Sequence, residues 1–137
     1  ALDPLGPRDI VNTPGSLELA IGNCTISART GGRFETTHAL VAAHLSGDVH
    51  ATQLWRKSVR DLACGIVSIV NCVDPEVVII GGGIAGAGEA LFDPLQEFLD
   101  EVEWRPHGHR VRIVAATLGE YAGAIGSAHN ARVPGSG

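Results

Sequence analysis

The chain has 137 residues, of which 45% are hydrophobic and 18% are charged, and its formal net charge at pH 7 is −5. This composition is typical of one globular domain and argues against a disordered chain. The negative charge and an aromatic content of only 4% argue against a nucleic-acid-binding surface, because no basic stripe is available to neutralise phosphates.

The sequence carries no signal for export or membrane insertion. No apolar run approaches the ~20 residues that span a bilayer, and the N-terminus lacks the basic-then-apolar pattern of a signal peptide. The three cysteines form no C-x-x-C motif and cannot all pair, so a cytoplasmic location is expected. Cys64 and Cys72 share one face of a helical pattern, and we expect both to be small core residues.

Helical spacing of apolar residues dominates the first half of the chain. Residues 1–14 are rich in proline and are expected to be irregular, whereas an apolar stripe predicts a helix over residues 16–29. Thr36 or Thr37 is expected to cap a short helix. A long helix follows over residues 49–73, and an Asp-Pro pair ends it. Its apolar positions, spaced by three and four, are Trp55, Val59, Leu62, Ile66, Ile69, Val70 and Val73.

The second half alternates between strands and helices. Asp93 and Pro94 are expected to form the N-cap and the first position of a helical segment. Strands that alternate with helices predict an α/β layer with a parallel sheet. The expected elements are a strand at 77–80, a helix at 87–103, a strand at 111–115 and a helix at 119–131, before a flexible tail at 133–137.

Three consecutive glycines, Gly81, Gly82 and Gly83, follow the first predicted strand. Because they lack Cβ atoms at the end of a strand, they allow a phosphate or a flat nucleoside to approach the backbone. The alternative is a tight turn without a ligand. A G-x-G-x-x-G pattern is also typical of dinucleotide-binding sites, but the acidic residue that such a site needs at the end of the next strand is missing.

The segments NCVDPEVVIIGGGIAGAG, LFDPLQEFL and VRIVAATLGEYAGAIGSA resemble the C-terminal half of ROK proteins over residues 50–131. This family contains sugar kinases and sugar-responsive repressors. The resemblance implies an α/β fold in which long helices pack on a short parallel sheet. This is the C-terminal part of the actin/hexokinase-like, ribonuclease H-like ATPase fold. Residues 15–132 are then expected to form part of the C-terminal lobe, and the N-terminal lobe is expected to be absent from this chain.

The resemblance also assigns roles to individual residues. Gly81, Gly82 and Gly83 match the turn that lies against the adenosine of ATP. Glu18 matches a glutamate that accepts hydrogen bonds from sugar hydroxyls, although an exposed glutamate that stabilises a helix start is an equally good interpretation. The last glycine-spaced helix, with Gly119, Gly123 and Gly126, is expected to pack closely against the sheet.

No metal site is predicted. The family's structural zinc needs cysteines before the segment that contains Glu18, and this sequence has none there, so no zinc is expected. His107 and His109 form the only close histidine pair, and two ligands do not make a metal site.

By resemblance, the chain is the nucleotide-side portion of an ATP-dependent, glucokinase-like hexose kinase that also uses Mg²⁺. The phosphate loops and the catalytic aspartate are expected upstream of Ala1, so no catalytic residue is predicted and the isolated chain is expected to be inactive. Two alternatives stay open: a sugar-sensing module of a ROK repressor, and a non-catalytic nucleotide-binding or oligomerisation fragment. The hexose is not determined by the sequence.

A partner is expected to cover the β-branched strand at residues 77–80. An open apolar strand edge favours aggregation, and a two-stranded sheet is marginally stable alone. The predicted partner is a second copy of the chain in a homodimer or a complementing N-terminal fragment.

Overall fold

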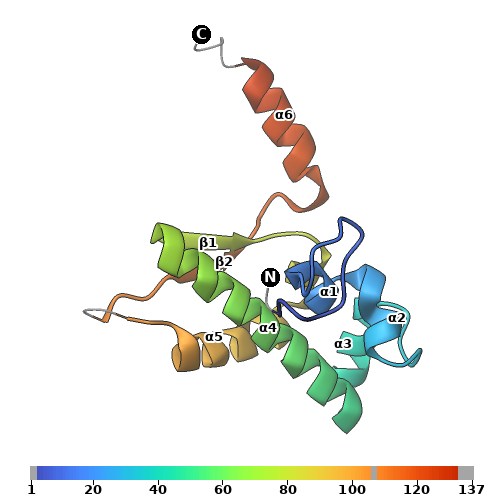
Figure 1. Ribbon diagram of the computed structural model, residues 1–137. Helices are drawn as coiled ribbons and strands as arrows, with labels where there is room; N and C mark the ends of the chain where they lie inside the picture. Colours follow the sequence, from blue (N-terminus) through green and yellow to red (C-terminus); the bar gives the residue numbers. More distant parts are fainter. Residues whose placement is uncertain (1–2, 106–107, 133–137) are drawn as a thin grey trace.

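A computed structural model describes residues 3–105 and 108–132 (Figure 1). The predicted tail at 133–137 lies outside these residues. In the described part of the chain, no helix has both the length and the apolar character needed to cross a membrane. The elements are α1 (Leu17–Ile21), η1 (Asn23–Thr25), α2 (Ile26–Arg29), α3 (Thr37–Leu45), α4 (Val49–Val73), β1 (Val77–Ile80), η2 (Gly83–Ala87), α5 (Glu89–Val102), β2 (Arg112–Ala115), η4 (Gly119–Tyr121) and α6 (Ala122–Arg132).

The apolar spacing correctly predicted the 25-residue helix α4, and this helix is the centre of the fold. It begins at Asp48, whose carboxylate accepts the amide N–H of Ala51 at 2.9 Å. It ends at Asp74, which adopts a left-handed conformation (φ 44°) immediately before Pro75. One face of α4 packs on α1, α3 and α5. The side chains that form the core with it include Ile26, Leu40, Trp55, Val59, Ile66, Leu91, Leu95 and Leu99.

The two strands pair in parallel, which confirms the predicted sheet. Val77 lies opposite Arg112, and Ile80 lies opposite Ala115. Side chains alternate between the two faces of a strand. Val78 and Ile80 therefore face the core, whereas Ile79 points the other way and is 63% exposed. One face of the sheet is covered by helices, and the described residues leave the other face bare.

The predicted helix over residues 16–29 is broken at Gly22, which is a correction. The backbone of Gly22 is extended (φ −64°, ψ 147°), and its N–H bonds to the carbonyl of Glu18 at 2.6 Å. A Cβ at this position would lie 2.4 Å from the same oxygen, so the break requires glycine. The predicted apolar stripe is also interrupted, because Cys24 and Ala28 are exposed whereas Ile26 is buried.

Pro94 lies inside α5 and not at its first position, so the predicted cap at Asp93 is wrong. A proline inside a helix leaves the carbonyl four residues earlier without its backbone donor. Here that carbonyl belongs to Ala90, and the indole N–H of Trp55 donates to it at 2.7 Å. A side chain from α4 thus replaces the missing helical hydrogen bond.

The last helix differs from its prediction. α6 extends away from the other elements (Figure 1), and no residue described in it is buried. A Cβ at Gly119, Gly123 or Gly126 would contact nothing within 4 Å, so the predicted close packing against the sheet is wrong in this structure.

The C-terminal end of α4 is more exposed than the sequence predicted. Ile69 and Val73 are 53% and 67% exposed, although their spacing placed them in the core. Cys72 is also exposed and Cys64 is partly exposed, so the prediction that both are core residues is wrong for Cys72. The described elements cover only one side of the last two turns of α4, and these residues lie on the other side.

Candidate functional site

The glycine turn after β1 presents bare backbone to open space. Gly82 has φ 74° and ψ −172°, a conformation that side-chain-bearing residues rarely adopt. A Cβ at Gly82 or Gly83 would contact nothing within 4 Å, whereas one at Gly81 would touch the methyl group of Ala116 at 3.5 Å. The turn is therefore closed on the side of β2 and open on the other side.

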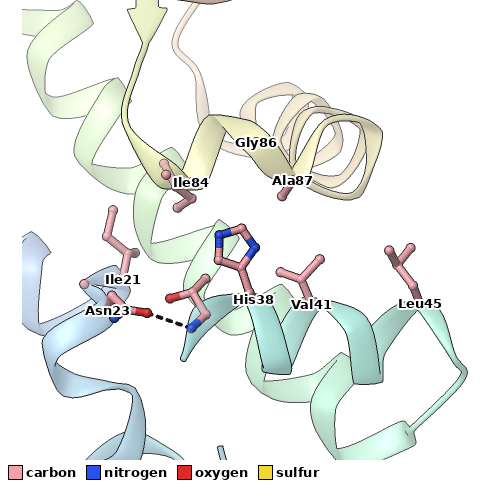
Figure 2. A pocket seen from close by; sticks show the side chains of 11 residues that line it. Ile21, Asn23, His38, Val41, Leu45, Ile84, Gly86 and Ala87 are labelled. Atoms are coloured by element: carbon pink, nitrogen blue, oxygen red, sulfur yellow. Dashed lines mark hydrogen bonds between the residues drawn. The ribbon is translucent and has the colours of Figure 1, made fainter. Parts of the chain in front are cut away.

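A cavity of about 370 Å³ lies beside this turn (Figure 2). Its size is at the lower end of the range for small-molecule sites. Its walls come from the end of α1, from η1, from α3 and from η2, which the chain brings together from three separate stretches. The lining residues are Ile21, Gly22, Asn23, Thr37, His38, Val41, Leu45, Gly83, Ile84, Gly86 and Ala87.

The lining is apolar except for three side chains. Asn23 Oδ1 accepts the backbone N–H of Thr37 at 2.8 Å, which satisfies one of the free amides in the first turn of α3 and joins η1 to α3. His38 projects from α3 towards η2 and is the one ionisable residue among those that line the cavity (Figure 2). Because no carboxylate or ammonium group of the described residues lines the cavity, it suits a ligand group without charge.

Arg29 holds the wall formed by Gly22. Its guanidinium donates to the carbonyl of Gly22 at 3.1 Å, to Thr25 Oγ1 at 3.1 Å and to Ser58 Oγ at 2.6 Å. Ser58 is buried on α4, so these bonds tie the cavity wall to the central helix. Burial lowers the pKa of Arg29, and this desolvation is partly offset by the charge of Asp61.

A second cavity of similar size lies at the opposite end of the sheet, and its chemistry is different. Its lining includes the carboxylates of Asp74, Glu76 and Glu103. Glu103 is already satisfied, because it accepts from Arg105 Nε at 2.8 Å and from the N–H of Val111 at 2.9 Å. His109 and Arg110 also line this cavity, but Arg110 is paired with Asp100 at 3.0 Å, so the three carboxylates disfavour an anionic ligand such as a nucleotide. This leaves the cavity beside the glycine turn as the candidate site.

The predicted site residues are only partly brought together. Of the three glycines, Gly83 lines the cavity, whereas Gly81 and Gly82 form the turn that leads into it. Glu18 is exposed in the first turn of α1 and does not line the cavity; its Oε1 lies 3.8 Å from Cys24 Sγ. Both assignments for Glu18, a sugar ligand and a helix-start carboxylate, stay open.

The sequence pattern did not mark Asn23, Thr37 or His38 as site residues. One signal was available: His38, Val41 and Leu45 are spaced by three and four, which places them on one face of α3. Nothing local indicated that this face looks towards the glycine turn. No three His, Cys, Asp or Glu side chains within 3–105 and 108–132 are grouped to hold a metal ion, and His107 of the predicted pair lies outside this part.

The sequence model of the ROK family matches residues 10–132. This range includes the segments on which the predicted resemblance rests. The chain belongs to the ROK family. It is 33% identical over 104 residues to a glucokinase of Streptomyces coelicolor, a match that covers 73% of this chain and 32% of the relative. The chain thus spans about a third of the length of that glucokinase.

Solved structures show the same fold. The ROK hexokinase of Thermus thermophilus has a TM-score of 0.75 and 28% identity, over 95% of this chain and 45% of that protein. A ROK glucokinase of Streptomyces griseus, solved with glucose and AMPPNP, has a TM-score of 0.71 and 21% identity, over 94% of this chain and 50% of that one. These matches confirm that this ROK chain has part of the hexokinase-like fold.

Proposed function

We propose that this chain forms the nucleotide-side portion of an ATP-dependent, glucokinase-like hexose kinase. The cavity against the glycine turn carries the proposal, because it combines bare backbone with a lining that holds no charged side chain other than the titratable His38. The sequence similarity to the glucokinase of S. coelicolor, and the structural similarity to the S. griseus glucokinase solved with AMPPNP, support a nucleotide-dependent sugar kinase.

The residues of the site fit the uncharged end of ATP. A nucleoside without its phosphates enters the cavity, and Gly83 admits it because no Cβ occupies the space. Gly81 and Gly82 offer backbone N–H groups and room for the phosphates outside the cavity. Glu18 is proposed to accept hydrogen bonds from hexose hydroxyls. When bound, ATP with Mg²⁺ supplies the transferable phosphoryl group and the neutralising charge.

Catalysis needs a further polypeptide. No carboxylate of the described residues lines the cavity, and His38, the one lining side chain that could act as a general base, faces the space proposed for the nucleoside. We propose that the isolated chain is inactive and that it works in the cytoplasm in a homodimer or with a complementing N-terminal segment. The bare sheet face around Ile79 supports such a partner, because both faces of parallel sheets are usually covered.

Calorimetric titration of the chain with ATP and with glucose tests the nucleotide proposal. Saturable heat with ATP is the expected result, and Gly83→Val should remove it because the branched side chain fills the cavity mouth. Heat with glucose alone favours the sugar-sensing module of a repressor instead. No heat with ATP at millimolar concentration contradicts the proposal.

Light scattering during size-exclusion chromatography tests the partner. A dimer, or a complex formed when an N-terminal fragment of a ROK kinase is added, is expected. A well-folded monomer that binds no such fragment contradicts this part of the proposal.

A further inference from the structure

We propose that His38 is the residue that contacts the base of the bound nucleotide and that its ring selects purines over pyrimidines. The inference rests on the proposed function, because it deepens the assignment of the cavity to a nucleotide. It adds a specificity-determining side chain on α3, which forms the wall of the cavity opposite η2.

The position of the ring carries the first step. Figure 2 shows His38 projecting from α3 into the gap below Ile84 and Ala87, with Val41 one turn further along the same helix face. Its imidazole thus faces the backbone of η2 across the cavity. Opposite it, a Cβ at Gly83 or Gly86 would contact nothing within 4 Å, so the space between the ring and the η2 backbone is open.

The hydrogen bonds of the site carry the second step. Within the described residues, no hydrogen bond occupies a ring nitrogen of His38, whereas His44 on the same helix bonds through Nδ1 to Thr52 Oγ1 at 2.9 Å. Asn23 Oδ1 already accepts the N–H of Thr37, which leaves Asn23 one further acceptor lone pair and the two donors of its amide group. Among residues 3–105 and 108–132, His38 is the one aromatic side chain that lines the cavity.

The shape of the space selects the ligand class. A slot with the flat ring of His38 on one side, and the glycine-rich η2 with the apolar side chains of Ile84 and Ala87 on the other, suits a planar, uncharged group. An aromatic ring stacks on any base, and the larger face of a purine buries more surface than a pyrimidine. Val41 and Ile84 complete an apolar rim that excludes water from the stacked base.

Binding measurements with ATP and CTP on the full chain test the role of His38. His38→Ala is expected to weaken ATP binding about tenfold, which is about 1.4 kcal/mol, and to reduce the preference for ATP over CTP. His38→Phe keeps a stacking ring and is expected to bind ATP within about threefold of the wild type. His129→Ala is the matched control, because His129 is exposed on α6, away from the cavity.

Thermal unfolding of each variant shows that the fold is kept, because His38 is exposed and outside the core. The inference is overturned if His38→Ala binds ATP within about twofold of the wild type, if His38→Phe is as weak as His38→Ala, or if the ATP-to-CTP preference is unchanged. A wild-type chain that binds no ATP refutes the proposed function itself, so the two failures are distinguishable.

Discussion

The bond between Trp55 and the helix that contains Pro94 allows a direct test of the packing. The indole N–H of Trp55 donates at 2.7 Å to the carbonyl of Ala90, the acceptor that Pro94 leaves without a helical donor. Trp55 is only 1% exposed and Ala90 is partly buried, so water has little access to the donor side of this bond. The pair Trp55 and Pro94 is therefore expected to be energetically coupled, although one lies on α4 and the other on α5.

Trp55→Phe removes the donor and keeps most of the aromatic volume. A buried carbonyl without a partner costs about 1–3 kcal/mol, and the smaller ring leaves a cavity, so the expected loss of unfolding free energy is about 2–4 kcal/mol. Pro94→Ala restores a backbone N–H that can donate to Ala90. In the Trp55→Phe background it is expected to recover about 1–2 kcal/mol of that loss.

Urea denaturation of the wild type, both single variants and the double variant gives the coupling as a double-mutant cycle. Helical circular dichroism reports unfolding in all four proteins. Trp104→Phe is the matched control, because Trp104 is 73% exposed, and its effect is expected to stay within about 0.5 kcal/mol. If the effects of Trp55→Phe and Pro94→Ala add within about 0.5 kcal/mol, the indole does not replace the helical bond.

Three further predictions concern the turn, a helix cap and the bare sheet face. Gly82→Ala is expected to lower the unfolding free energy by about 1–3 kcal/mol through its positive φ, whereas Gly83→Ala should leave stability nearly unchanged and weaken ATP binding; equal stability losses contradict this. The backbone N–H of Ala51 lowers the pKa of Asp48 from its usual 3.8, so Asp48 stabilises the protein above about pH 4 and this contribution is lost as the pH falls through the lower folded-state pKa. Asp48→Asn is expected to keep the cap and to reduce the loss of unfolding free energy at low pH, as measured by urea denaturation at several pH values. An unchanged loss at low pH contradicts this prediction. Ile79→Asp is expected to leave the monomer folded and to abolish assembly in light scattering, and a dimer that persists shows that the partner binds elsewhere.

The sequence predicted the elements whose signal is local. α4 and the parallel strands were predictable because the apolar spacing that indicates them, and the turn residues that bound them, lie within short stretches of sequence. The break at Gly22 was not visible, because the helical spacing of apolar residues continues through it in the sequence, although Cys24 and Ala28 of that pattern are exposed in the structure. Pro94 was misplaced for a related reason: the donor that lets it lie inside a helix is a tryptophan 39 positions earlier, and no window of α5 contains it.

The site was predictable only on its glycine side. The run of Gly81 to Gly83 is a local signal, whereas the opposite wall depends on which face of α3 turns towards η2, and packing decides that. His38 carries no mark that separates it from His44, which bonds to Thr52 instead. Long-range placement, not residue type, distinguishes the candidate base-binding histidine from a structural one.

The bare face of the sheet links the sequence signal to the proposed partner. The β-branched run at 77–80 predicted a strand buried on both faces, and the structure covers only the face that Val78 and Ile80 occupy. Ile79 on β1 and Ile69 and Val73 on α4 are exposed apolar side chains for which this part of the chain provides no cover. A chain that had evolved to be alone would place polar residues there, because exposed β-branched strands favour aggregation. The apolar pattern therefore supports the proposed partner, a polypeptide that would complete both the sheet and the proposed kinase site.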